Sequence, residues 1–89
     1  MIVEFDKSFN KSIIRLKDKS IALKLEKLIE LLESIDTISK APNSKKLTGF
    51  QVYYRIRIGD YRVGIEKIND KTIRLITVAH RKEIYKIFP

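Results

Sequence analysis

The residues of this chain best suited to chemistry are cationic and aromatic, and they lie in its second half. Residues 52–58, Val-Tyr-Tyr-Arg-Ile-Arg-Ile, alternate apolar and cationic side chains with a period of two. A strand with this pattern has one apolar face and one face that carries Arg55 and Arg57. Arginines beside an aromatic side chain such as Tyr53 favour a phosphate-binding surface, and among phosphate ligands they favour nucleic acid.

The net charge of +8 belongs entirely to residues 40–89. Residues 1–39 hold seven basic and seven acidic side chains, whereas residues 40–89 hold twelve basic and four acidic ones. Five of the six arginines follow residue 50, and arginine suits planar, bidentate phosphate contacts. Lysines alone are also compatible with a role in solubility, so the arginines carry the prediction of a phosphate site.

A histidine, an arginine and a tyrosine follow the last apolar run, in the sequence Thr-Val-Ala-His-Arg-Lys-Glu-Ile-Tyr at residues 77–85. His80 is a natural acid or base near neutral pH, although a single histidine is more often structural. Tyr85, four residues past Arg81, also fits a core anchor. The chain has no cysteine and no cluster of His, Asp and Glu with metal-ligand spacing, so we expect no metal site and no cofactor.

The pattern of apolar residues predicts the elements that must position these side chains. Residues 1–5 predict a short strand, Asp6 an N-cap for a first helix, and apolar residues from Ile21 to Ile35 a second, antiparallel helix. Residues 36–49 predict a loop. Three further strands are expected at 50–58, 61–68 and 72–79. The predicted fold is therefore α+β, with an N-terminal strand and a two-helix hairpin packed on a mainly antiparallel four-stranded sheet.

The length and composition of the chain predict one domain, residues 1–89. No apolar run approaches the roughly 20 residues that span a bilayer, and the first residues lack the basic and apolar regions of a signal peptide. We therefore expect a cytoplasmic protein without a membrane partner.

Gly59-Asp60 predicts a type II′ hairpin turn that fixes how two strands pair. If Ile58 faces Tyr61, then Arg57 lies opposite Arg62, and Arg55 lies opposite Gly64. Like charges placed opposite each other cost a few tenths to about 1 kcal/mol. Either an anion lies between the two arginines or both side chains extend into water, and a ligand can approach the backbone closely over Gly64.

A second hairpin that closes on Asn69-Asp70 would pair Arg62 with Thr77. Ala79 and Arg81 would then share the face of Arg62, whereas a three-residue turn would move them to the other face.

Residues 54–63, Tyr-Arg-Ile-Arg-Ile-Gly-Asp-Tyr-Arg-Val, followed by residues 79–85, Ala-His-Arg-Lys-Glu-Ile-Tyr, resemble the RelE/ParE toxin superfamily, and specifically its RelE branch. The resemblance covers essentially the whole chain, including Lys-Leu-Thr-Gly at residues 46–49. It implies a toxin of a type II toxin-antitoxin system that enters the ribosomal A site, cuts mRNA there without a metal, and is neutralised by a RelB-like antitoxin. We expect the antitoxin to contact the outer helix face and the tail near Ile84 and Ile87.

Carried over residue by residue, the resemblance implies catalytic roles for the following positions: Arg62, Arg81, Tyr85 and His80. The basic pair of the first hairpin strand falls on Arg55 and Arg57, which are lysines in well-studied relatives. Because arginine stays protonated, a role as general base is in doubt there. Charge and position predict further RNA contacts by these residues: Lys45, Lys46, Tyr53 and Lys82. Glu66 is a candidate base on the arginine face, and the identity of the base stays open.

Two other functions remain compatible with the sequence. One is a ParE-like toxin that binds DNA gyrase and cuts nothing, and the other is an inactive member that only binds RNA. The combination of Arg62, Arg81 and Tyr85 favours the nuclease.

Overall fold

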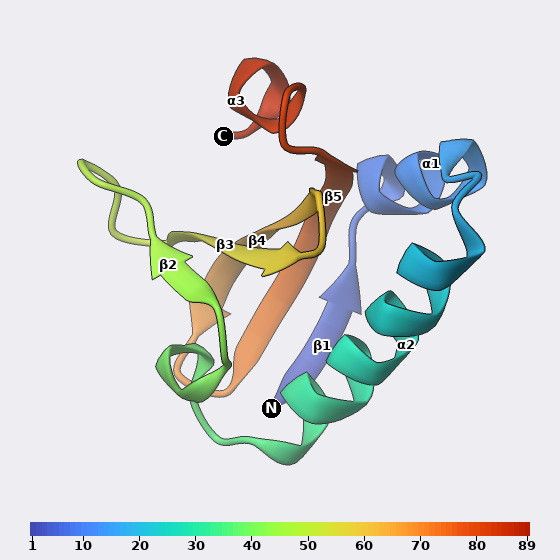
Figure 1. Ribbon diagram of the computed structural model, residues 1–89. Coiled ribbons are helices and arrows are strands. Elements are labelled where there is room, and N and C mark those ends of the chain that lie inside the picture. The colour runs from blue at the N-terminus through green and yellow to red at the C-terminus, as the bar shows by residue number, and fades with distance from the viewer.

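The computed structural model describes all residues, 1–89, and its centre is a mixed sheet of five strands (Figure 1). In spatial order the strands are β1 (Ile2–Phe5), β5 (Thr72–His80), β4 (Tyr61–Asn69), β3 (Tyr53–Ile58) and β2 (Ser44–Lys46). Strand β1 is parallel to β5, and all other neighbours are antiparallel. The predicted α+β class is confirmed, with one strand more than the sequence indicated.

The extra strand, β2, lies within residues 36–49, which we expected to form a loop. Lys45 pairs with Arg55 along the free edge of β3. A strand of three residues has too few positions to show a period, and lysines are common on edge strands because they discourage further pairing. A 3-10 turn, η1 (Ile38–Lys40), precedes it. The tail also contains a single helical turn, α3 (Ile84–Ile87).

Both long helices begin at aspartate caps. Asp6 accepts a hydrogen bond from the Ser8 amide (3.0 Å) at the start of α1 (Lys7–Arg15), as predicted. Asp18 accepts from the amides of Ser20 and Ile21 at the start of α2 (Lys19–Ser34). Helix α1 packs mainly against β5, and α2 packs against β1 and β3. The two helices therefore diverge instead of lying along each other as the expected hairpin would (Figure 1).

The main core lies between the helices and the apolar face of the sheet. The apolar stripes of the helices and strands predict seven buried residues, including Tyr54, and the other six are buried there: Leu25, Leu28, Leu32, Ile56, Val63 and Ile65. Tyr54 is only partly buried, although it packs against this core. Because Ile56 and Ile58 face the helices, the side chains between them face the opposite side of the sheet.

The first hairpin has the register that the sequence predicted. Arg57 pairs with Arg62, and Arg55 pairs with Gly64. Gly59 has a φ of 62° and Asp60 does not have a positive φ, as a type II′ turn requires.

The second hairpin differs from the prediction by two residues. It closes on Asp70-Lys71, and Arg62 pairs with Ala79 instead of Thr77. Two irregularities, at Gly64/Ile65 and Lys67/Asn69, shift the register and do not appear in the apolar pattern. At Arg62 the shift is two residues, which keeps the facing side chains on the predicted side of the sheet, so Ala79 shares the face of Arg62 as expected. Between the two irregularities the shift is only one residue, and Glu66 pairs with Arg74.

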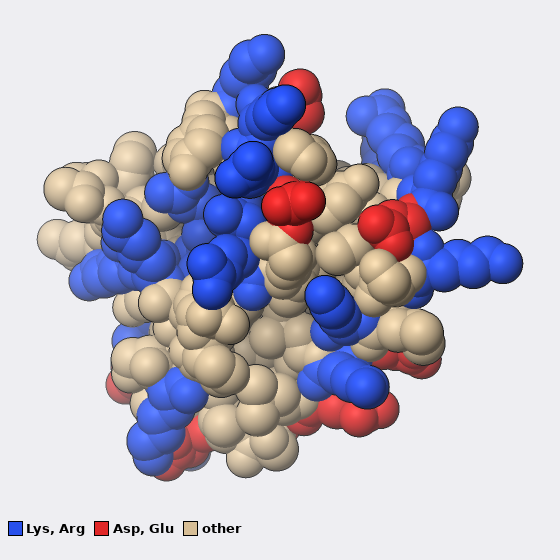
Figure 2. All heavy atoms as spheres, viewed as in Figure 1, with Lys and Arg blue, Asp and Glu red and all other residues tan.

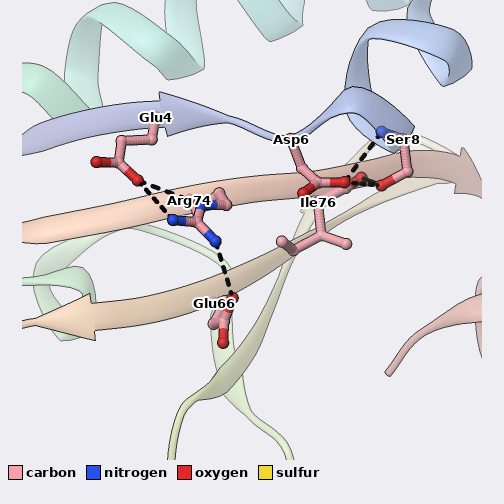
Figure 3. Close-up of polar contacts among 6 residues, drawn as sticks. All are labelled: Glu4, Asp6, Ser8, Glu66, Arg74 and Ile76. Carbon is pink, nitrogen blue, oxygen red and sulfur yellow. Dashed lines mark hydrogen bonds and ion pairs between the residues drawn. The ribbon is translucent and has the colours of Figure 1, made fainter.

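An ionic and hydrogen-bonded network ties the N-terminal segment to the sheet (Figure 3). Arg74 on β5 lies between Glu4 on β1 (3.0 Å) and Glu66 on β4 (3.9 Å). The hydroxyl of Ser8 lies 2.6 Å from the Asp6 carboxylate and 2.5 Å from the Ile76 carbonyl oxygen. These contacts hold β1 and the start of α1 against β5. None of the helices combines the length and the apolar character of a membrane-spanning helix.

The aspartate caps predict that the free energy of unfolding falls at acidic pH. Hydrogen bonds from the Ser8 side chain and amide lower the pKa of Asp6 below its ordinary 3.8, and bonds from Ser20 and Ile21 do the same for Asp18. A lowered pKa in the folded state stabilises the fold above pH 3.8, and that contribution is lost as the pH falls through the folded-state values. In urea unfolding at a series of acidic pH values, the double variant Asp6→Asn, Asp18→Asn, which keeps neutral caps, should show a flatter decline than the wild type. Parallel declines would contradict this assignment.

Candidate functional site: an arginine cleft

The sheet face opposite the two long helices holds a cleft of about 360 Å³ that we call the arginine cleft. Its lining residues are Asn43, Ser44, Lys45, Arg55, Arg57, Arg62 and Tyr85. Four of them are cationic, and none is a carboxylate. Figure 2 shows Lys and Arg side chains gathered in the hollow between the regions of β2 and α3. The cleft is therefore electrostatically suited to an anion.

Strand alternation and strand pairing bring the basic residues of β2 and β3 together. Arg55 and Arg57 alternate with the buried Ile56 and Ile58, and so face away from the helices. Lys45 is the direct cross-strand partner of Arg55. The strand that the sequence did not reveal thus places a lysine at the site.

Arg57 and Arg62 face each other across the β3–β4 pair without a carboxylate between them. Arg62 Nη1 donates to the carbonyl oxygens of Gly59 (3.2 Å) and Tyr61 (3.0 Å). These carbonyl dipoles hold the guanidinium at the hairpin turn and offset part of the repulsion. The remaining N–H groups of both guanidinium ions can donate to a phosphate.

Tyr85 reaches the cleft from α3. Its side chain is 68% exposed, and the guanidinium carbon of Arg55 lies 4.6 Å from the ring centroid. This distance fits a cation–π contact. An exposed aromatic ring against a guanidinium plane gives the cleft a surface on which a nucleobase can stack.

Arg81, Lys82 and Lys46 lie outside the cleft lining. The Arg81 amide donates to the carbonyl oxygen of Asp60 (2.8 Å), which ties residue 81 to the hairpin that carries Arg62. Arg81 and Lys82 are exposed in the turn after β5. Lys46 pairs with Tyr54 and so belongs to the opposite face of the sheet. Of these three, only Arg81 has a backbone hydrogen bond to the hairpin turn next to Arg62.

The structure does not bring His80 to the arginine cleft. His80 pairs with Tyr61, and the two rings meet edge to face with centroids 5.4 Å apart. Because Ala79 shares the face of Arg62, the next residue along the strand faces the other way. His80 instead lines a second cleft of about 480 Å³ between α1, the end of β5 and the tail, which we call the α1 cleft.

Tyr53 and Glu66 lie on the expected face but are engaged elsewhere. The Tyr53 ring packs edge to face with Phe50 (5.6 Å between centroids) and Phe88 (5.5 Å). Glu66 interacts with Arg74, away from the cleft lining. Both side chains therefore lie on the predicted face of the sheet but outside the lining of the arginine cleft.

Sequence reasoning missed Asn43 and Ser44 as lining residues. Asn43 has a φ of 62°, a conformation that asparagine adopts more readily than most residues, and it turns the chain into β2. The only sequence signal for this is the dipeptide Pro-Asn at residues 42–43, which is typical of a turn. That turn directs Ser44 and Lys45 along the edge of β3. No group of three or more His, Cys, Asp or Glu side chains is placed to hold a metal ion.

Comparisons with known proteins agree with this architecture. A family model described as the ParE toxin of type II toxin-antitoxin systems matches residues 3–85. Toxin RelE3 of Methanocaldococcus jannaschii is 38% identical over 90 residues, with 100% of each chain covered.

Two solved structures are also similar. The RelB-RelE antitoxin-toxin complex from Methanococcus jannaschii contains a chain with a TM-score of 0.81 and 36% identity, covering 97% of this chain and 99% of that one. The archaeal RelE-RelB complex from Pyrococcus horikoshii gives a TM-score of 0.70 and 26% identity, with 90% and 93% covered. On the strength of the family match and the identity to Toxin RelE3, this chain belongs to the RelE/ParE family and is a RelE-like toxin of a type II toxin-antitoxin system.

Proposed function

We propose that this toxin is an endoribonuclease that cuts mRNA in the ribosomal A site, with the arginine cleft as its active site. The observation that carries the proposal is the convergence of Arg55, Arg57 and Arg62 on one cleft without a carboxylate, with the exposed ring of Tyr85 lying over Arg55. This combination of phosphate-binding cations and a stacking surface suits one unstacked nucleotide and its phosphate. Such a protein acts in the cytoplasm, where ribosomes translate.

The chemistry needs no metal. The 2′-hydroxyl oxygen of the RNA attacks the adjacent phosphorus and the bond to the 5′-oxygen breaks, which leaves a 2′,3′-cyclic phosphate and a 5′-hydroxyl. Arg57 and Arg62 neutralise the negative charge that grows on the non-bridging oxygens. Arg55 holds Tyr85 and adds a further positive charge.

Proton transfer falls to Tyr85 and Lys45 in this proposal. Apart from the arginines, these are the two side chains of the cleft lining that carry an ionisable group. Arg55 and Arg57 stay protonated, and His80 faces the α1 cleft, so the proposal gives none of the three a part in proton transfer. Arg81 is proposed to reach the bound RNA from the margin, beside Arg62.

An antitoxin similar to RelB is the proposed protein partner, because the two similar archaeal structures are RelB-RelE complexes. The lining of the α1 cleft includes the apolar residues Leu16, Ile76, Val78 and Ile87. Its charged residues are Lys11, Arg15 and Glu83, so positive charge predominates. An acidic amphipathic segment would complement it. Ile87 is 55% exposed and accessible to such a segment, whereas Ile84, which we also expected at this surface, is fully buried.

A reconstituted test uses purified ribosomes carrying a defined mRNA with an empty A site. We expect a single cut within the A-site codon in the presence of the toxin. No cut is expected on the same mRNA without ribosomes, or when the nucleotide on the 5′ side of the cut carries a 2′-deoxy group. Cleavage of the 2′-deoxy substrate would contradict the proposed chemistry.

RNA binding should depend steeply on salt. If each of the four cations of the arginine cleft contacts one phosphate of single-stranded RNA, the slope of log affinity against log salt is about −3, or about a fiftyfold loss between about 50 and 200 mM salt. Binding of a short RNA measured by fluorescence anisotropy tests this, and Arg57→Ala should reduce the slope by about 0.7. A flat response would mean that the charge serves solubility only.

A further inference from the structure

The position of Tyr85 depends on a small apolar cluster that is separate from the main core. Helix α3 is a single turn, and it is anchored by Ile84 and Phe88, which pack with Leu47 on the arginine side of the sheet. Both anchors are buried, at 0% and 6% exposure, while Tyr85 between them is exposed. The distance at which Ile84 and Phe88 pack against the sheet therefore also determines the position of Tyr85.

Gly64 on β4 lies directly beneath the Phe88 ring. A Cβ atom built on Gly64 would lie 2.7–2.9 Å from Cγ, Cδ1 and Cδ2 of Phe88. Carbon atoms without a bond between them do not approach so closely, since their optimal separation is about 3.5–4.0 Å. The space over Gly64, which the sequence suggested was open to a ligand, is thus filled by the tail of the chain itself.

Strand pairing connects this contact to the arginine cleft. Gly64 is the direct cross-strand partner of Arg55, and Arg55 is the residue whose guanidinium lies against the Tyr85 ring. Phe88 follows Tyr85 by three residues at the end of the same helical turn. The Phe88 ring contacts Gly64, and the Tyr85 ring contacts Arg55. Both rings therefore belong to the same helical turn, α3 and its C-cap, which docks over the Gly64–Arg55 pair.

We propose that Gly64 is a positioning residue: the absence of its side chain sets the depth at which Phe88 docks α3, and this depth places Tyr85 over Arg55. The consequence for RNA cleavage rests on the function proposed above, whereas the placement of Tyr85 does not. An added methyl group at residue 64 would raise Phe88 and move Tyr85 away from Arg55.

A different role for Gly64 predicts a different result. Gly64 borders an irregularity in the β4–β5 register, so glycine could be required there by the strand backbone alone. In that case alanine would disturb the strand pairing, and a smaller side chain at residue 88 would repair nothing. If glycine is required at residue 64 because of steric contact with the Phe88 ring, a smaller side chain at residue 88 should restore the Tyr85–Arg55 contact that Gly64→Ala removes.

The test compares the wild type with Gly64→Ala, Phe88→Val and the double variant, because valine lacks the two Cδ atoms that a methyl group at residue 64 would meet and can turn its Cγ atoms away. Two readouts are taken: NMR cross-peaks between the Tyr85 ring and the Arg55 side chain, and single-turnover cleavage on ribosomes. We expect Gly64→Ala to lose the cross-peaks and about a hundredfold in cleavage rate, as a displacement of about 1 Å can cause. The double variant should regain the cross-peaks and most of the rate, with amide exchange of β3, β4 and β5 unchanged throughout.

Two results would overturn the proposal: Gly64→Ala with intact Tyr85–Arg55 cross-peaks, or a double variant that regains neither readout. If Gly64→Ala does not fold, Phe88→Ala replaces it. Phe88→Ala leaves the sheet itself unchanged. It should release α3 and remove the Tyr85–Arg55 cross-peaks. Cross-peaks that persist in this variant would contradict the proposal. A wild type that shows the cross-peaks but does not cleave would remove the proposed function and leave the NMR comparison to decide the positioning role.

Discussion

Tyr85→Ala should lower the rate of mRNA cleavage by about a hundredfold and leave the free energy of unfolding within about 0.5 kcal/mol of the wild type. The side chain is 68% exposed and belongs to neither apolar cluster, so its removal creates no cavity. The loss in rate follows because the ring offers a stacking surface and its hydroxyl a proton. Single-turnover cleavage and urea unfolding measure the two quantities separately.

Two variants make this result specific. Ile87→Ala removes an apolar side chain from the same helical turn. Ile87 is 55% exposed, like Tyr85 on the surface, but it lines the α1 cleft instead of the arginine cleft. It should cleave at the wild-type rate. Tyr85→Phe keeps the ring over Arg55 and removes only the hydroxyl, so a rate close to that of Tyr85→Ala would identify proton transfer as the main contribution. Equal losses in Ile87→Ala and Tyr85→Ala would mean that α3 has simply lost its structure.

Arg62→Ala should reduce cleavage by a hundredfold or more, about 3 kcal/mol of transition-state stabilisation, with little change in stability. Its removal relieves repulsion from Arg57, worth a few tenths to about 1 kcal/mol, but also removes two hydrogen bonds to the hairpin carbonyl oxygens. From the sequence alone we expected a small gain in stability. The carbonyl contacts in the structure predict that the two effects nearly cancel.

Arg15→Ala is the matched control, because it removes the same charge from an exposed position on α1 outside the arginine cleft. It should bind RNA and cleave like the wild type. Arg81→Ala is the informative companion, since the family resemblance implies a catalytic role for Arg81 although this residue is outside the cleft lining. A loss as large as that of Arg62→Ala would mean that bound RNA brings Arg81 onto the phosphate. Wild-type cleavage by Arg62→Ala would refute the assignment of the cleft.

Local signals predicted the parts of the fold that local chemistry determines. Asp6 satisfies amides at the start of a helix, and Gly59 supplies the positive φ of a hairpin turn, so one helix start and one strand register could be read from single residues. The register of the second hairpin could not, because its irregularities depend on how β4 and β5 fit together. Strand β2 forms only because β3 offers it a free edge.

The candidate site divides in the same way. A period of two places Arg55 and Arg57 on one face, and the register set by the Gly59-Asp60 turn adds Arg62 to that face. Tyr85 came from family resemblance, since its place in the structure depends on the docking of Phe88 on Gly64, a contact across 24 residues that no periodicity reveals. His80 was attractive for its chemistry, but its neighbour Ala79 shares the face of Arg62, and strand alternation therefore places His80 on the opposite side of the sheet.

Mapping of mRNA ends in bacteria is the sharpest test of whether this toxin arrests growth by cutting translated mRNA. The wild type and Tyr85→Ala are each induced, and primer extension compares a translated reporter with the same reporter lacking its start codon. We predict codon-phased cuts only on the translated reporter and only with the wild type. Growth arrest by the wild type without any new mRNA ends would contradict the claim and favour a ParE-like toxin that acts on DNA gyrase.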